Sequence, residues 1–362
     1  MTTTTHQPHY LDPSLQRAHL AIFYRNFAAK NPTVSHIGLG VNALHTAKVL
    51  RKRRIRCDVF PAWTAEDVEQ GLRQHPSVTH CLIEAPWVGT DQLAKMLHDF
   101  PHVQFLVRAH SQIGFLQVEP GAIKLMRDQV LLAEGQLNLT VSANTAKLCE
   151  FFRIAYGANL LYLPNLYDIE RPHRKRDVHH GHRIVRIGSF GALRLLKNHT
   201  TAAAAAMMIA RERGSDLELH MTVDRVEHGK SVLDAVRAMT AGVPGVRLVE
   251  AKWASWPEFR RQVSHMDLCL QPSMTETFNL VTADAVAEGV PCVVSPSIEW
   301  VPDSWKADCD EVEDMARIGS HLLSSHSGAE EGLRHLERYV REGVDTWERY
   351  LASCPLDPCN RH

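Results

Sequence analysis

The chain has 362 residues, of which 44% are hydrophobic and 22% are charged. This length is enough for two domains with sizeable cores, and the composition excludes a disordered chain, a collagen-like repeat and a disulfide-stapled miniprotein. Forty Lys and Arg stand against 41 Asp and Glu, so the net charge of −1 predicts no polyanion partner unless a local patch provides the attraction.

The apolar segments and the cysteines bear on the compartment of the protein, and the histidines on metal binding. The most apolar segment, residues 202–210, is too short to span a membrane, and the first residues lack a signal-peptide pattern. The eight cysteines include no CxxC pair, so we expect a cytoplasmic protein with reduced thiols. His179, His180 and His182 lie in a polar stretch, where we expect solvated side chains; a metal-ligand cluster is the alternative.

The first half of the chain alternates short apolar runs with amphipathic ones. This rhythm is typical of βαβ units and favours a parallel sheet covered by helices on both faces. The predicted strands are residues 34–38, 55–60, 80–85, 103–108, 137–142 and 160–163, and the predicted helices are 43–53, 65–74, 91–100, 121–134 and 145–156.

The same rhythm restarts after a polar, basic segment. Strands are predicted at 184–188, 217–223, 246–249, 268–271 and 292–295, and helices at 198–213, 231–241, 256–265 and 277–288. We therefore predict an α/β protein with two Rossmann-like domains facing a central cleft: residues 1–167, a linker at 168–182, residues 183–330, and a C-terminal segment at 331–362. Ligands of such sheets bind at the carboxyl ends of the strands.

Two glycine-containing loops are candidates for binding phosphate. Gly38 and Gly40 precede a predicted helix but lack the third glycine of a dinucleotide fingerprint, so a plain tight turn is the alternative. The loop from Gly188 to Asn198 combines glycine with Arg194 and Lys197, which could hold a diphosphate. A surface turn with solvated cations is the alternative there.

The segment from residue 270 to 295 predicts a strand, a polar turn and a helix that begins near Glu276, with Thr275 as its cap. On such a helix Glu276 and Asp284 would stand ~12 Å apart along the axis, because the rise is ~1.5 Å per residue. Two carboxylates at this spacing could hold hydroxyls at both ends of a nucleotide sugar; solvated carboxylates are the alternative. His110 follows a predicted strand and could contact substrate, or it could be structural.

The motif from Pro272 to Val293 resembles the signature of retaining family 4 glycosyltransferases, which have the GT-B fold. In that family a Pro-Ser pair precedes Glu-x7-Glu and then Ala-x-Gly-x-Pro-Val. The resemblance extends in order over about residues 34 to 350, including Thr140–Ser142, Tyr162–Asp168 and Gly188–Asn198. It implies a UDP- or GDP-sugar donor, no obligatory cofactor or metal, and C-terminal helices that cross back onto the first domain.

The resemblance also implies roles for individual residues. Glu276 would contact the donor sugar, Asp284 the ribose, Lys197 and Arg194 the diphosphate, and His110 the acceptor side of the sugar. Gly40 would leave room beside the diphosphate. Other donor-binding positions carried over from the family are Gly191, Ser273, Thr277, Phe278 and Asn279.

Two positions depart from the family pattern. Asp284 replaces a Glu, and Ser189 replaces the Arg that follows the strand glycine, so the role of Arg194 rests on reaching in from another position. Asp308-Cys-Asp310 is not interpreted as a metal-binding DxD motif, because it opens an acidic helix rather than ending a strand.

The acceptor is open. A basic run, Lys48, Arg51, Lys52, Arg53 and Arg54, is either a solvated helix end or a face for an anionic acceptor. A glycan, a lipid, a small molecule or a hydroxymethylated DNA base would each fit a hydroxyl acceptor, and peripheral contact with a membrane is compatible. Two other functions remain as alternatives: a nucleotide-sugar epimerase or isomerase, and a non-catalytic nucleotide-sugar-binding module.

Overall fold

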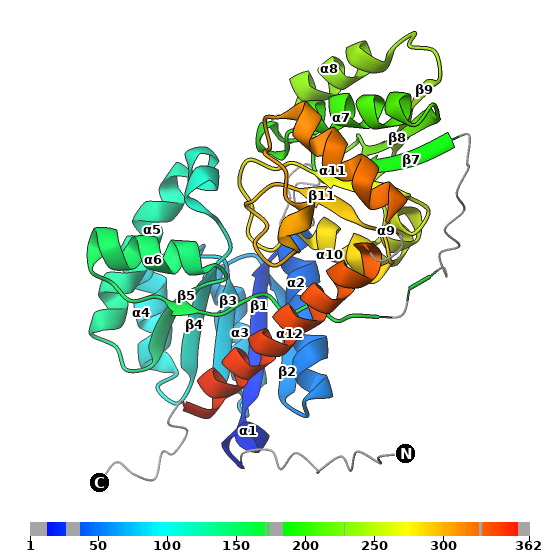
Figure 1. The fold of residues 1–362 in the computed structure, drawn as a ribbon. Helices are drawn as coiled ribbons and strands as arrows, with labels where there is room; N and C mark the ends of the chain where they lie inside the picture. The colour runs from blue at the N-terminus through cyan, green and yellow to red at the C-terminus, as the bar shows by residue number, and fades with distance from the viewer. Residues whose placement is uncertain are drawn as a thin grey trace, which may run out of the picture.

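The computed structural model describes residues 13–26, 37–170, 172–173, 184–227, 229–325 and 328–353. It contains two all-parallel β sheets, each flanked by helices (Figure 1). The first lobe comprises the elements from α1 to β6, and the second lobe those from β7 to α11. The predicted α/β architecture of two Rossmann-like units facing a cleft is confirmed.

The first lobe is built on a 6-stranded sheet in the order β2-β1-β3-β4-β5-β6. The chain leaves β1 to one side for β2 and then crosses to the other side for β3, which creates a switch point beside β1. Its elements are α1 Pro13–Arg17, β1 His19–Arg25, α2 Ile37–Lys52, β2 Arg56–Ala62, α3 Ala65–Gln74, β3 His80–Glu84, α4 Thr90–Asp99, β4 Gln104–Ala109, η1 Ile113–Val118, α5 Pro120–Glu134, β5 Leu139–Ala143, α6 Ala146–Tyr156 and β6 Leu161–Tyr162.

The second lobe has a 5-stranded sheet in the order β11-β10-β7-β8-β9, with its switch point between β7 and β10. Its elements are β7 Ile184–Ser189, η2 Leu195–Lys197, α7 His199–Glu212, β8 Asp216–Thr222, α8 Lys230–Thr240, β9 Val246–Ala251, α9 Trp256–Val263, β10 Leu268–Gln271, α10 Leu280–Ala287, β11 Cys292–Val294, η3 Asp303–Trp305 and α11 Val312–Ser324.

The first strand differs from the prediction. The structure places β1 at His19–Arg25, a segment that the sequence analysis did not assign, and its residues 20–23 are buried as expected of a central parallel strand. The strand predicted at 34–38 is wrong where it can be checked, since Ile37 and Gly38 open helix α2; residues 34–36 lie outside the described residues. Short apolar runs do not distinguish a strand from a helix start by periodicity alone.

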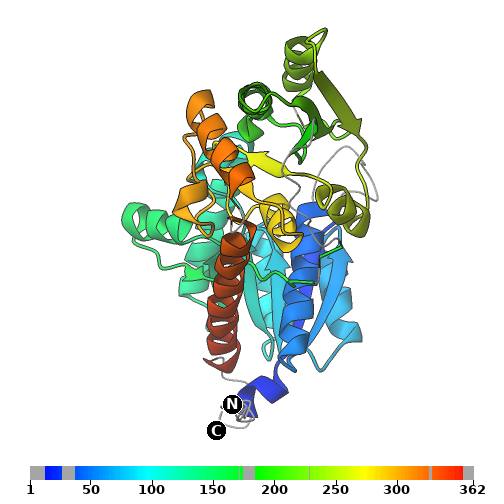
Figure 2. The same cartoon turned by 45° about the vertical axis from the view of Figure 1, so that its right-hand side comes forward.

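Helix α12, Gly328–Ser353, connects the two lobes (Figures 1 and 2). Its Leu336 belongs to the core of the second lobe, whereas its Trp347 is buried in the core of the first. The Trp347 indole Nε1 donates to the Pro164 carbonyl at 2.9 Å, where the chain passes between the lobes. Most of the linker predicted at 168–182 lies outside the described residues.

Candidate active site

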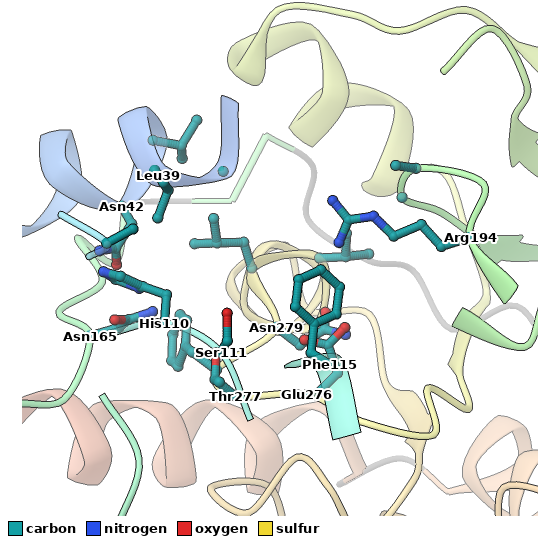
Figure 3. Close-up of a pocket in the computed structure, with 18 of the residues that line it drawn as sticks. Leu39, Asn42, His110, Ser111, Phe115, Asn165, Arg194, Glu276, Thr277 and Asn279 are labelled. Atoms are coloured by element: carbon teal, nitrogen blue, oxygen red, sulfur yellow. The ribbon is translucent and has the colours of Figure 1, made fainter. Parts of the chain in front are cut away.

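A cavity of about 660 Å³ opens between the lobes, where the carboxyl ends of both sheets meet (Figure 3). The first lobe contributes the start of α2 and the loops that follow β3 and β4; the second contributes the loops that follow β7, β8, β9 and β10. The predicted site residues in its lining are His110, Gly191, Arg194, Lys197, Glu276, Thr277, Phe278, Asn279 and Asp284.

Lys197 and Glu276 form an ion pair at the cavity wall. Lys197 ends η2 after β7, and Glu276 lies in the loop after β10, so the two neighbouring strands at the switch point bring them together. Their side chains are only 16% and 14% exposed. Gly191, at φ +120°, lies where an added Cβ would be 3.8 Å from the Cε of Lys197, so the backbone runs close to this ammonium group.

Glu276 is not part of a helix, which corrects the sequence-based expectation. Helix α10 begins at Leu280 and is capped by Asn279, whose Oδ1 accepts from the Thr282 amide at 2.9 Å. Asn279 adopts a left-handed φ of 57°, which ends the preceding loop and forbids a helix through it. The axial distance predicted between Glu276 and Asp284 therefore does not apply.

Asp284 lies deep in the wall and is 2% exposed. Its Oδ1 accepts from the Tyr167 hydroxyl at 2.6 Å and from the Trp256 indole at 2.9 Å. Burial raises the pKa of Asp284 to about 7, although both hydrogen bonds favour the charged form. Asp284 therefore holds its proton to a much higher pH than an exposed aspartate does.

His110 has both ring nitrogens engaged. Nε2 lies 2.5 Å from the buried carboxylate of Glu84, and Nδ1 lies 3.3 Å from Asn144 Nδ2. Because Asn144 Nδ2 is a donor, the Nε2 proton is the one donated to Glu84. Burial lowers the pKa of His110 despite the pull of Glu84, so the ring is neutral at pH 7. Asn144 also donates to Thr277 Oγ1 at 3.1 Å, which links the two lobes.

Glu84 was missed by the sequence analysis. It is fully buried at the end of β3, where Arg108 donates to it at 2.5 and 3.0 Å. Although burial opposes ionisation, Arg108 and His110 hold the pKa of Glu84 at about 2. No local sequence pattern marks Glu84, because its partners Arg108 and His110 lie on and just after the next strand, β4.

The second-lobe wall carries two arginines, of which the sequence analysis named only Arg194. Arg194 reaches into the cavity and lies 5.2 Å from the centre of the Phe115 ring (Figure 3). Its Nε contacts Glu227, which also accepts from Arg225 Nε at 3.1 Å. Arg225 in turn lies 4.1 Å from the centre of the Trp253 ring. The loop after β8 gave no motif by which to find Arg225.

Other predicted positions have mainly structural partners. Phe278 is 2% exposed and stacks on Tyr339 of α12, at 5.2 Å between ring centres. Ser273 is buried and lies outside the cavity lining. Gly40 also lies outside the lining, because its α carbon faces the Tyr24 ring.

The basic run of α2 is largely neutralised by neighbouring acids. Lys48 pairs with Glu170 at 3.0 Å, Arg51 with Asp58 at 3.6 Å, Lys52 with Asp168, and Arg53 with Glu348 at 2.7 Å. Arg54 is exposed at the helix end. These pairs join α2 to β2, to the interlobe crossing and to α12, so the charges have structural partners.

Within the described ranges, no group of three or more His, Cys, Asp and Glu side chains is placed to hold a metal ion. Among the helices that the structure describes, none has the length and apolar character needed to cross a membrane.

Comparison with known proteins gives one family match. Residues 157–298 match the model described as family 4 glycosyltransferases in conflict systems. This segment contains the loops that carry Lys197, Arg225 and Glu276. No curated protein matches the chain by sequence.

Solved structures with the same fold cover most of the chain. Anabaena HepE, solved with UDP-glucose, is 14% identical with a TM-score of 0.61, over 92% of this chain and 98% of its own. The trehalose-6-phosphate synthase OtsA is 10% identical with a TM-score of 0.62, over 93% and 98%. TarM of S. aureus is 13% identical with a TM-score of 0.57 over 80% of this chain, which spans only 58% of TarM. At these identities the likeness establishes the fold.

Proposed function

We propose that the chain, which has the GT-B fold, is a family 4 glycosyltransferase that moves a hexosyl group from a UDP- or GDP-sugar to a hydroxyl acceptor, with retention of anomeric configuration. The observation that carries the proposal is the pairing of Lys197 with Glu276 in a cavity between the carboxyl ends of two parallel sheets. HepE, which shares the fold, was solved with UDP-glucose.

The leaving diphosphate makes the main electrostatic demand of this reaction. Lys197 and Arg194 both line the cavity, and the start of α10 faces it through Asn279 and Leu280. Cationic side chains and a helix N-terminus favour the charge that develops as the bond from the sugar to the diphosphate breaks. In this role Lys197 exchanges Glu276 for a phosphate oxygen.

The sugar would then lie between Glu276 and His110. Once Lys197 contacts phosphate, the Glu276 carboxylate is free to accept hydrogen bonds from sugar hydroxyls. The neutral ring of His110 is oriented by Glu84, so its Nδ1 could accept a hydrogen bond from a sugar hydroxyl in place of the one from Asn144. The new bond to the acceptor oxygen forms on the face that the diphosphate leaves, and the acceptor proton passes to the departing phosphate oxygen.

The acceptor wall favours an uncharged hydroxyl compound over a polyanion. Among the described lining residues, the first-lobe wall is mostly apolar (Ala85, Pro86, Leu116 and Met126), and its charged member is the carboxylate Glu119. Since the basic run of α2 is paired with acids, it offers little attraction to an anion. A glycan, a small molecule or a lipid headgroup hydroxyl therefore fits this wall better than a hydroxymethylated base of DNA, which brings a polyanionic backbone with it.

A donor panel tests the proposal directly. Purified protein is incubated with UDP- and GDP-sugars, alone and with each acceptor class, and release of UDP or GDP is measured. We expect release by the natural chain and its loss in Glu276→Ala and Lys197→Ala, with Arg237→Met as a control, because Arg237 is exposed on α8 and pairs with Glu250. Conversion of the donor without an acceptor would identify an epimerase or isomerase; tight binding without any turnover would identify a binding module.

A further inference from the structure

Arg225 is a buried arginine of the cavity wall that takes no part in the transfer steps proposed above. It lines the cavity from the loop after β8, yet its side chain is only 7% exposed. Its Nε donates to Glu227, whereas its buried Nη2 has no hydrogen-bond partner among the described residues. A buried guanidinium nitrogen without a partner is costly, so a ligand group that reaches it would be bound well.

The backbone fixes Arg225 beside the loop that carries Lys197. The Leu193 amide donates to the Arg225 carbonyl at 2.8 Å, and the Glu227 amide donates to the Leu193 carbonyl at 2.9 Å. Gly229 permits this approach, because a Cβ there would lie 2.2 Å from the Leu193 oxygen. The loops after β7 and β8 therefore form one short parallel ribbon at the cavity wall.

The charge on this ribbon is incompletely balanced. Glu227 contacts both Arg194 and Arg225, so one carboxylate serves two guanidinium groups. Burial lowers the pKa of Arg225 even with Glu227 beside it. The Trp253 ring covers one face of the Arg225 guanidinium, and Nη2 is buried without a hydrogen-bond partner among the described residues. A planar guanidinium edge matches a phosphate group in both charge and donor geometry.

The position just after the β7 glycine cannot supply this charge. Ser189 stands there, it is 1% exposed, and its Oγ lies 2.8 Å from His199 Nδ1. We propose that Arg225 binds a phosphate oxygen of the donor diphosphate, with Arg194 beside it and Glu227 holding both guanidinium groups. This inference rests on the proposed function, because it assumes that the cavity takes a nucleoside diphosphate.

Calorimetry with the whole chain tests the inference. UDP affinity is measured directly, and inorganic pyrophosphate is measured as a competitor of UDP, for the natural chain, Arg225→Met and Arg225→Gln. We expect both affinities to fall about tenfold to a hundredfold in Arg225→Met, as for the loss of one charge-assisted hydrogen bond to phosphate. Arg237→Met removes an exposed arginine of the same lobe and should leave both affinities unchanged.

Each of the other outcomes contradicts either the role of Arg225 or the proposed function. Equal affinities in the natural chain and Arg225→Met overturn the inference alone. A loss for UDP without a loss for pyrophosphate overturns the phosphate contact and places Arg225 on the base or ribose. Failure of the natural chain to bind either UDP or GDP overturns the proposed function and the inference with it. Arg225→Gln keeps a donor for Glu227, so it provides a folded variant for the same comparison if the thermal unfolding midpoint of Arg225→Met collapses.

Discussion

Lys197 and Glu276 neutralise each other at the cavity wall, although they lie 79 positions apart in the chain. Both side chains are more than four-fifths buried, so water solvates neither charge fully. In the proposed reaction, the donor diphosphate would compete with Glu276 for Lys197. Donor binding would then break the ion pair and free both side chains to contact the donor.

Removing either partner should separate binding from transfer. In Glu276→Gln the ammonium of Lys197 loses its competitor, so we expect UDP to bind as tightly as in the natural chain or more tightly, while transfer falls about a hundredfold. In Lys197→Met we expect UDP affinity itself to fall about tenfold or more. Calorimetry and nucleotide-release rates measure the two effects. A parallel loss of UDP affinity in both variants would contradict the exchange of partners.

The pH dependence of stability should report on Asp284. Its pKa is about 7 in the folded chain and near 3.8 in the unfolded chain, so the folded state holds the proton more tightly. The stability gained from this proton is complete below about pH 4 and is lost as the pH rises towards 7. We expect Asp284→Asn, which cannot ionise, to gain stability relative to the natural chain by roughly 4 kcal/mol across that window.

Denaturant unfolding at several pH values measures this difference. Asp234→Asn is the matched control, because Asp234 is an exposed aspartate on α8 of the same lobe. If the difference between Asp284→Asn and the natural chain stays constant from pH 5 to pH 8, the carboxyl group does not titrate there.

Local sequence patterns identified the loops that carry site residues, but they did not identify site residues that depend on contacts with other parts of the chain. Lys197 and Glu276 were found from short motifs that follow strands, because the carboxyl end of a parallel strand is a binding position wherever the strand lies in the sheet. The start of α10 was predicted too early, because the spacing of apolar residues does not reveal the left-handed conformation of Asn279. Glu84 and Arg225 were missed because their partners, Arg108 and Trp253, are set by strand order and by loop contacts.

Substitutions of Glu84 and His110 should affect different properties, the first the stability of the fold and the second the transfer reaction. Glu84→Gln leaves Arg108 buried without its counter-charge, so we expect the free energy of unfolding to fall by about 3–5 kcal/mol near neutral pH. The pKa of Glu84 is depressed, so this deficit should shrink as the pH falls from about 4.5 towards 2. His110→Gln should unfold almost like the natural chain but lose transfer. If the two variants lose the same stability, His110 serves only the fold.

Gly40 and Gly38 distinguish a packing role from a ligand role at the start of α2. A Cβ on Gly40 would lie 2.8 Å from Tyr24 Cε2, so Gly40→Ala should force the ring to shift and cost about 1–3 kcal/mol of stability. A Cβ on Gly38 meets nothing within 4 Å, and alanine favours a helix by about 0.5–1 kcal/mol. Gly38 lines the cavity and Gly40 does not.

Thermal unfolding and UDP affinity, measured on Gly38→Ala and Gly40→Ala, therefore distinguish the packing role from the ligand role. If Gly40→Ala lowers UDP affinity and leaves the unfolding midpoint unchanged, Gly40 makes room for the diphosphate, as the family resemblance implied, and not for Tyr24.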